Sequence, residues 1–199
     1  MTSLENAIEL ALSAHAGQID EDGLPHIAHS LEVMFLAAIG HRAYSAEIGE
    51  SLADFMAAAA LHDVVEDTHV TLDRIRDEFG GDVARLVDGV TRRRGEPYRD
   101  FIYRAGAEPG TRALKTADVT INRGRTHRIK RAAWRSKLEY KYTVALRVLS
   151  SESPGAPAWE RESFEWVAGE GAVRLYVASP DGRRTEIAEA EARRMGLIK

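Results

Sequence analysis

Hydrophobic residues recur every three to four positions through most of the first 150 residues, which is the period of α-helices with one buried face. Capping residues at the expected starts and glycines near several ends divide this region into separate helices. The expected helices cover about residues 3–15, 27–39, 45–62, 72–79, 83–90, 97–105, 111–122 and 133–149. Asp82 is expected to cap the helix that starts at Val83. The pattern predicts an all-helical bundle up to about residue 150.

The pattern changes after residue 150. Ser151–Pro157 is rich in Ser, Pro and Gly and is predicted to be a linker. The elements expected beyond it are strands near 164–167, 173–177 and 183–187, a turn at 180–182 and a helix over 188–195. The predicted fold is therefore mainly α, with a helical domain over residues 1–150 and a small β/α appendage over residues 158–199.

Composition narrows the function classes. The 199 residues carry a formal net charge of −4, which does not favour bulk nucleic-acid binding or a polybasic membrane anchor. The chain has no cysteine, which excludes disulfides, a thiol nucleophile and cysteine-ligated metals. It begins without the features of a signal peptide and has no apolar run of transmembrane length. We expect a soluble, cytoplasmic protein.

The strongest chemical signal is His62-Asp63, which follows the apolar run Ala57–Leu61 and precedes the acidic pair Glu66-Asp67. Residues three to four apart share one helix face, so these four side chains can meet at one end of a cavity. Burying them together costs free energy unless something compensates, and a divalent metal binds imidazole and carboxylate groups together. A solvated helix end with a capping histidine is the structural alternative.

A catalytic metal needs further ligands, and His29 and Asp118 are the candidates. His29 follows the Gly17–Pro25 loop, and Asp118 interrupts an apolar-periodic segment. With His62 and Asp63 they make a set of two imidazoles and two carboxylates, which suits Mn²⁺ or Fe²⁺, and also Zn²⁺. Taken singly, His29 could be a core histidine and Asp118 a cap or an ion-pair partner.

These motifs resemble the HD superfamily of metal-dependent phosphohydrolases, specifically the hydrolase domain of the RelA/SpoT alarmone enzymes and their small stand-alone relatives. The resemblance covers roughly residues 4–150. The matching segments are 14–18, 23–29, 61–68, 79–91 and 114–122. The resemblance implies that His29, His62, Asp63 and Asp118 bind a metal, usually manganese. It implies that Glu66 and Asp67 orient and deprotonate the attacking water and that Asn122 contacts a nucleotide.

Basic residues near these motifs are further candidates for substrate contacts. Lys115 belongs to the matched segment before Asp118, and Arg123 opens a cluster of Arg and Lys residues that extends to Lys137. Arginine and lysine pair readily with phosphate oxygens, so this cluster can grip a phosphorylated substrate. A solvated helix face is the alternative for the cluster.

The chain also departs from the alarmone hydrolases. Asp20, Glu21 and Asp22 stand where those enzymes carry basic residues that hold the purine, His26 replaces a tyrosine, and Ser30 replaces a proline. An acidic loop is expected to repel phosphate and cannot stack a cation on guanine. From this loop we expect weak turnover of guanosine tetraphosphate (ppGpp).

The expected function is metal-dependent hydrolysis of a phosphoester or pyrophosphate bond in a nucleotide. By resemblance, the first candidate is the (p)ppGpp 3′-pyrophosphohydrolase reaction, which yields GDP and pyrophosphate from ppGpp. The alternatives are an HD phosphohydrolase of another nucleotide and a regulatory module that keeps its metal without turnover. The expected partner is a small nucleotide, not bulk nucleic acid or a membrane. The pattern leaves open the metal's identity, the oligomeric state and the role of the appendage.

Overall fold

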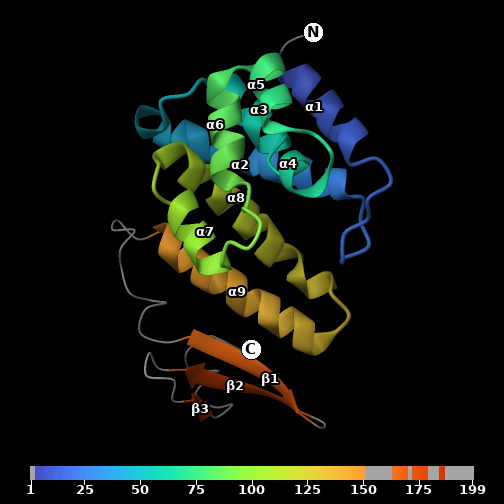
Figure 1. Cartoon of the computed structure of the whole chain (residues 1–199), viewed down its shortest axis with the longest axis vertical. Coiled ribbons are helices and arrows are strands. Elements are labelled where there is room, and N and C mark those ends of the chain that lie inside the picture. Colours follow the sequence, from blue (N-terminus) through green and yellow to red (C-terminus); the bar gives the residue numbers. More distant parts are fainter. Residues whose placement is uncertain (1–2, 151–162, 170–171, 179–183, 187–199) are drawn as a thin grey trace.

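The computed structural model describes residues 3–150, 163–169, 172–178 and 184–186, in which a helical bundle is followed by a small β-sheet (Figure 1). The helices are α1 (Ser3–Ala14), α2 (His26–Ile48), α3 (Leu52–Ala60), α4 (Val64–Asp67), α5 (Leu72–Phe79), α6 (Gly81–Val90), α7 (Tyr98–Ala105), α8 (Pro109–Arg125) and α9 (Ala132–Ser150), with the 3-10 helix η1 (Thr126–Arg128) before α9. The strands are β1 (Ser163–Gly169), β2 (Ala172–Ala178) and β3 (Arg184–Glu186). This order of elements confirms the predicted helical bundle followed by strands.

Helix α3 lies at the centre of the larger hydrophobic core, where it contacts α1, α2, α6 and α8. Its four consecutive alanines, Ala57–Ala60, are fully buried. Their small side chains let the neighbouring helices approach closely, and Phe55 and Leu61 fill the space on either side. The centre of the bundle is therefore packed tightly just before the His62-Asp63 pair.

A second, smaller core lies between α7, α8 and α9 around Phe101, Ile102 and Val148. Helix α8 takes part in both cores, because Ala117 belongs to the first and Val119 to the second. Asp118 therefore lies on the helix that joins the two cores.

The predicted end of the second helix at Ile39 is wrong. Helix α2 continues through Gly40 to Ile48. One glycine inside a helix costs about 1 kcal/mol relative to alanine. Buried His41 and Ile48 lie in the added turns, where their contacts with the core offset that cost.

The predicted start of the third helix near residue 45 is also wrong, because α3 begins at Leu52. The break falls at Gly49, whose φ of +77° is a conformation that favours glycine. Ser51 then caps α3, and its hydroxyl oxygen accepts a hydrogen bond from the amide of Asp54 at 3.1 Å.

Of the predicted N-caps of α5 and α6, the first is confirmed and the second is wrong. Thr71 caps α5 by accepting a hydrogen bond from the amide of Arg74 at 3.2 Å. Asp82 is not the cap of α6, because that helix begins at Gly81 and Gly80 is its N-cap. Asp82 lies in the first turn, where its charge still favours the helix dipole.

The three strands form one antiparallel sheet in the order β1-β2-β3. Ser163 pairs with Ala178 and Gly169 with Ala172, and β3 pairs with the end of β2. The predicted linker at 151–157, the turn at 180–182 and the helix at 188–195 lie outside the described residues. The division into domains at 1–150 and 158–199 remains a prediction.

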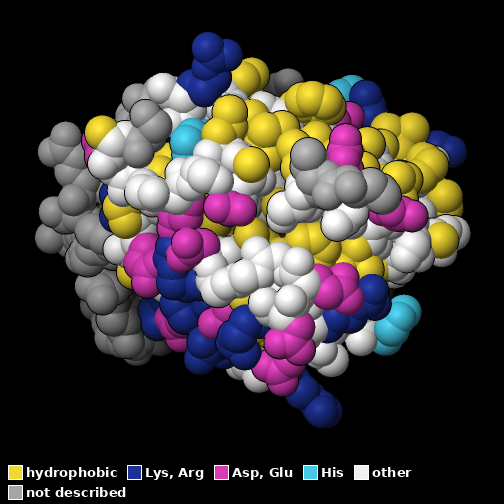
Figure 2. Space-filling view, turned by 90° about the horizontal axis from the view of Figure 1, so that it is seen from above, with side chains coloured by type: hydrophobic (Ala, Val, Ile, Leu, Met, Phe, Trp, Pro, Cys, Tyr) yellow, Lys and Arg dark blue, Asp and Glu magenta, His cyan; other side chains and the backbone are white. Residues whose placement is uncertain are grey.

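The surface of the bundle is uneven in polarity. Figure 2 shows hydrophobic side chains gathered over one half of one face and charged side chains mixed over the other half. The large hydrophobic side chains exposed in the described residues are Leu12, Ile19, Phe35, Ile39 and Leu52. Among the described helices, none has the length and apolar character needed to cross a membrane.

Candidate metal centre

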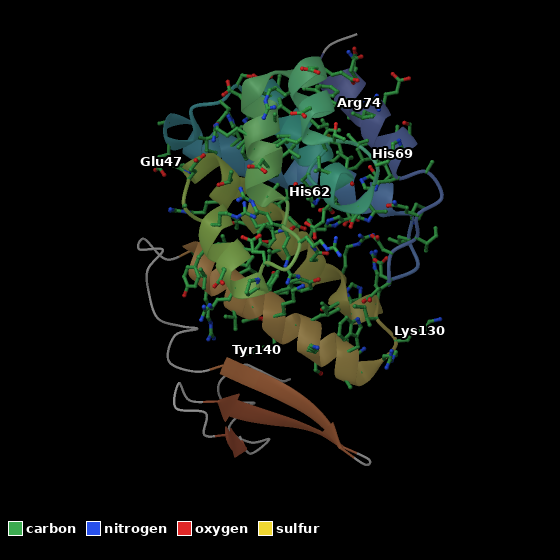
Figure 3. All side chains as sticks on the ribbon, in the orientation of Figure 1. Glu47, His62, His69, Arg74, Lys130 and Tyr140 are labelled. Carbon is green, nitrogen blue, oxygen red and sulfur yellow. The ribbon has the colours of Figure 1, made fainter. Side chains whose placement is uncertain are left out.

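His62 and Asp63 lie in the turn between α3 and α4. Leu61 is wholly buried and anchors this turn in the core. Figure 3 shows His62 inside the bundle, whereas His69 and Lys130 lie at its periphery. His62 Nδ1 is 2.9 Å from the carbonyl oxygen of Ala59, so it donates its proton there and directs Nε2 toward the neighbouring carboxylates.

The four expected ligands come together from three parts of the chain: α2, the α3–α4 turn and α8. His62 Nε2 lies 2.9 Å from Asp63 Oδ2, and His29 Nε2 lies 3.5 Å from the same oxygen. Asp118 Oδ1 lies 3.2 Å from His29 Nε2 and 3.8 Å from His62 Nε2. Ligand atoms of His29, His62 and Asp118 lie within 4.8 Å of one another. Such a cluster is compact enough to surround one cation.

The pKa values of these groups show that the cluster favours positive charge. Burial alone lowers the pKa of His29, but its hydrogen bonds to Asp118 and Asp63 outweigh burial and raise the pKa to about 9. Burial also opposes the charged form of His62, yet the charges of the adjacent Asp63 and Asp118 raise its pKa to about 10. Burial opposes ionisation of both aspartates, but His62 for Asp63 and Lys115 for Asp118 hold their pKa values well below the usual range.

A divalent cation fits this donor set. Two imidazole nitrogens and two carboxylates are ligands that Mn²⁺, Fe²⁺ and Zn²⁺ accept. His62 Nε2 is fully buried and has no hydrogen-bond partner within the described part of the chain, although it faces Asp63 and Asp118. A bound cation would satisfy this nitrogen and would supply the positive charge that protonated imidazoles otherwise bring.

Glu66 and Asp67 lie one turn beyond the pair, on the short helix α4. Burial and the nearby charges of Asp63 and Glu66 raise the pKa of Asp67 to about 6. Glu66 Oε2 accepts a hydrogen bond from the backbone amide of Arg92 at 2.8 Å. Both carboxyl groups line the same cavity as Asp63, as their spacing in the sequence predicts.

The loop that holds Glu66 is itself fixed by Arg104. The guanidinium of Arg104 donates hydrogen bonds to both carboxylate oxygens of Glu96 at 2.8 Å. It also donates to the carbonyl oxygen of Thr91 at 2.9 Å. These contacts close the segment between α6 and α7, which carries the Arg92 amide that binds Glu66.

Three of the four candidate ligands, His29, Asp63 and Asp118, line an open cavity of about 290 Å³. Its wall combines carboxylates and imidazoles with cationic, amide and aromatic groups. The polar and aromatic lining residues are Asp20, Glu21, Asp22, His26, His29, Asp63, Glu66, Asp67, Arg92, Tyr98, Phe101, Lys115, Asp118, Asn122, Arg125, Lys141 and Tyr142. A cavity of this size and polarity can admit part of a small, charged ligand.

Of the three expected substrate contacts, two line the cavity. Lys115 is buried, and its Nζ lies 2.6 Å from Asp118 Oδ2. Asn122 Nδ2 donates a hydrogen bond to Asp118 Oδ1 at 2.5 Å. Arg123 is exposed and does not line the cavity, whereas Arg125, two residues later on α8, is buried and does.

The acidic loop, which is expected to repel phosphate, has partners of its own in the structure. Arg125 Nη1 donates to Asp20 Oδ2 at 2.8 Å, and Arg125 Nε lies 2.9 Å from Asp22 Oδ2. Trp134 Nε1 donates to Glu21 Oε2 at 2.5 Å. Arg128 Nη1 also lies 3.4 Å from Asp22 Oδ2, so residues from the end of α8 to the start of α9 offset part of the negative charge of the loop. In turn, part of the basic cluster expected to grip phosphate is paired with protein carboxylates.

Several cavity residues lie outside the predicted site, among them the ionisable residues His26, Arg125 and Lys141. His26 lies three residues before His29 on one helix, and this spacing is the sequence signal that the two side chains share a face. Arg125 was part of the basic cluster, without a sign that it alone is buried. Lys141 lies on the long helix α9, whose amphipathic pattern does not indicate that this residue faces the cavity. Burial and the charge of Lys115 lower the pKa of Lys141 to about 8.

Known proteins of similar sequence carry names from alarmone metabolism. The chain has 34% identity over 131 residues to a probable GTP pyrophosphokinase of Mycobacterium leprae, which covers 61% of this chain and 16% of that protein. It has 33% identity over 127 residues to a guanosine-3′,5′-bis(diphosphate) 3′-pyrophosphohydrolase of Aquifex aeolicus, which covers 60% of this chain and 17% of that protein. The match thus spans about a sixth of these relatives' length.

The fold is also similar to a solved structure. The chain superposes with a TM-score of 0.62 and 23% identity on a metazoan ortholog of SpoT, covering 76% of this chain and 87% of the other. Residues 7–108 match the family described as HD domain, which is half of the chain. These residues include His29, His62 and Asp63, and Asp118 joins them from α8 just beyond. The chain therefore belongs to the HD domain family, whose members bind a divalent metal at such a site.

Proposed function

We propose that this protein is a metal-dependent phosphohydrolase and that its substrate is ppGpp, cleaved at the 3′-diphosphate to give GDP and pyrophosphate. The observation that carries the proposal is the convergence of His29, His62, Asp63 and Asp118 beside a cavity lined with further acids and cations. The names of two classes of relatives, the pyrophosphohydrolases and the SpoT ortholog, support the choice of substrate.

The four ligands would hold one divalent ion, which we propose is Mn²⁺. When bound, such an ion lowers the pKa of a water molecule and polarises a phosphoryl oxygen. In the reaction, the water oxygen forms a bond to the phosphorus next to the 3′-oxygen, the bond from that phosphorus to the 3′-oxygen breaks, and a proton passes to the 3′-oxygen.

Glu66 and Asp67 are placed to handle that proton. Both carboxyl groups line the cavity next to Asp63. In the metal-free protein, burial and the charges of Asp63 and Glu66 raise the pKa of Asp67 to about 6. A positioned acid or base typically contributes about a hundredfold to ten-thousandfold in rate. These two residues favour an enzyme over a regulatory module, because a metal that is only structural needs neither.

Cations in the cavity are suited to the phosphate groups. Lys141 lines the cavity, and no carboxylate of the described residues forms an ion pair with it; its Nζ lies 4.1 Å from the centre of the Tyr98 ring. Lys115 reaches the cavity from α8 next to Asp118. Asn122 adds an amide that can donate to the ligand. Arg125 and Arg128 pair with Asp20 and Asp22, so the acidic loop opposes a phosphorylated substrate less than its sequence indicates.

Purified Mn²⁺-loaded protein should be incubated with ppGpp, GDP, GTP and ATP, and the products separated by anion exchange. We expect GDP and pyrophosphate in equal amounts from ppGpp and little change in GDP, which lacks the 3′-diphosphate. If another nucleotide is hydrolysed faster, that nucleotide is the substrate in place of ppGpp, and the protein is still a metal-dependent phosphohydrolase. No hydrolysis of any nucleotide by a folded, metal-loaded protein would favour the regulatory module.

A further inference from the structure

Three histidines, one more than the expected ligand set contains, surround a single oxygen of Asp63. Besides His62 and His29, His26 also faces Asp63 Oδ2, from which its Nε2 lies 3.4 Å away. The rings form a continuous row, with centroids 5.5 Å apart between His26 and His29 and 5.2 Å apart between His29 and His62. His26 is therefore part of the same polar cluster, although a one-metal set does not use it.

His26 is oriented as a metal-binding histidine is. Its Nδ1 lies 2.7 Å from Asp20 Oδ1, so a carboxylate holds one ring nitrogen and turns the other toward Asp63. A carboxylate or carbonyl that binds the second ring nitrogen commonly fixes the tautomer of a metal-ligating histidine. His62 has the same arrangement with the carbonyl of Ala59. The His26 Nε2 atom is buried and has no hydrogen-bond partner within the described residues.

A second compact donor set lies beside the first. Ligand atoms of His26, Asp63 and Asp67 lie within 4.8 Å of one another, and Asp63 also contacts both histidines of the first set. One imidazole and two carboxylates can bind a divalent cation such as Mn²⁺ and leave positions open for water or substrate. Arg125 holds Asp20 in place from the other side, at 2.8 Å.

We propose that this centre binds two divalent cations, the second one held by His26 and Asp67 with Asp63 shared between the two. This inference rests on the proposed function for the first metal. Two neighbouring cations suit a diphosphate, because they can contact both the attacking and the leaving oxygen. It assigns Asp67 to metal binding and leaves Glu66 as the acid that handles the proton. It also gives the acidic loop a role, since Asp20 orients His26.

The rival explanation is that His26 forms only an ion pair with Asp63. The test is the number of Mn²⁺ ions bound per chain. Metal-stripped full-length protein is titrated with MnCl₂, and bound metal is measured by equilibrium dialysis with elemental analysis and by electron paramagnetic resonance. We expect two ions per chain in the natural protein, with a spectrum broadened by coupling between two Mn²⁺ ions.

His26→Phe should bind one ion with an uncoupled six-line spectrum. Asp20→Asn tests the same site without removing a ligand and should lower the affinity for the second ion by about tenfold to a hundredfold. His127→Phe is the matched control, because His127 is exposed and lies outside both donor sets, and it should still bind two ions. Circular dichroism checks that each variant is folded.

One ion per natural chain would overturn the proposal, and so would a second ion that persists unchanged in both His26→Phe and Asp20→Asn. Hydrolysis of ppGpp with one bound ion would leave the proposed function standing and remove only the second site. Two bound ions without hydrolysis would support the second site and contradict the proposed function.

Discussion

Arg125 and Asp20 lie 105 positions apart in the sequence, yet their side chains meet at 2.8 Å beside the cavity. Asp22 shares the same guanidinium at 2.9 Å, and its side chain is 5% exposed. Because these charges are largely shielded from water, the ion pairs join the acidic loop to the end of α8 more firmly than surface pairs would. From the sequence alone, Asp20 and Asp22 are expected to repel phosphate. In the structure they are paired with Arg125 and form part of the cavity wall.

Replacing Arg125 by methionine should lower the free energy of unfolding by about 3 kcal/mol. The variant leaves Asp20 with His26 alone and Asp22 with the more exposed Arg128 alone, and removing one partner of a buried ion pair is strongly destabilising. Urea denaturation followed by circular dichroism measures the change. Arg123→Met is the matched control on the exposed side of α8, where we expect a change within about 0.5 kcal/mol. Equal losses in the two variants would contradict the structural role of Arg125.

Replacing Glu66 by glutamine should reduce kcat by about a hundredfold to ten-thousandfold while the metal content stays unchanged. Glutamine keeps the shape and can still accept the hydrogen bond from the Arg92 amide, but it cannot take up the proton of a water molecule. Steady-state kinetics and elemental analysis are measured on the same samples. If the metal is lost together with activity, Glu66 is a ligand or a structural residue instead.

Lys141 should make substrate binding dependent on pH. Its pKa is lowered from 10.5 to about 8 by burial and by Lys115, so its side chain is an ammonium below pH 8 and a neutral amine above it. We expect KM to rise as the pH passes through about 8. The same pKa shift affects folding. Between pH 8 and 10.5, Lys141 is protonated in the unfolded chain and neutral in the folded one, so its contribution makes the free energy of unfolding rise with pH.

Two variants separate Lys141 from other titrating groups. Lys141→Arg stays charged and should remove the rise in KM near pH 8. Lys141→Met should raise KM by about tenfold or more at pH 7, because a charged hydrogen bond contributes about 1.5–3 kcal/mol. In this variant KM should no longer change near pH 8. A rise that persists unchanged in Lys141→Arg would assign the dependence to another group.

The segment after residue 150 should be dispensable for the chemistry. His29, His62, Asp63 and Asp118 all precede it, and residues 4–150 contain both hydrophobic cores of the bundle. A chain ending at Ser151 should remain folded, bind metal and retain kcat within about threefold, as judged by circular dichroism, elemental analysis and kinetics. An insoluble or metal-free product would place the appendage in the core or in an interface.

The sequence predicted the elements that depend on local signals. The apolar periodicity and the caps placed α5, α8 and α9 within a few residues, and the alternation after residue 160 placed β1 and β2. The boundary of α2 was missed because burial of Ile48 and His41, which is a tertiary effect, carries the helix past Gly40.

In the candidate site, too, local sequence predicted some features and tertiary packing determined the others. Spacing on one helix predicted that Glu66 and Asp67 would adjoin Asp63, and the motifs brought in His29 and Asp118. The partner of Asp20 could not be predicted, because Arg125 is one of many basic residues in its region and only the packing of α8 against the loop distinguishes it from Arg123. Lys141 was missed because it reaches the cavity from another helix through tertiary packing alone.

The most direct test of the proposed metal-dependent hydrolysis is the release of GDP and pyrophosphate from ppGpp as Mn²⁺ is added back to metal-stripped protein. We expect no products from the stripped protein, a rate that rises with bound Mn²⁺, and no recovery in His62→Ala at the same Mn²⁺ concentration. Turnover that continues at full rate in excess chelator, or ppGpp that stays intact with a folded and fully Mn²⁺-loaded protein, would contradict it.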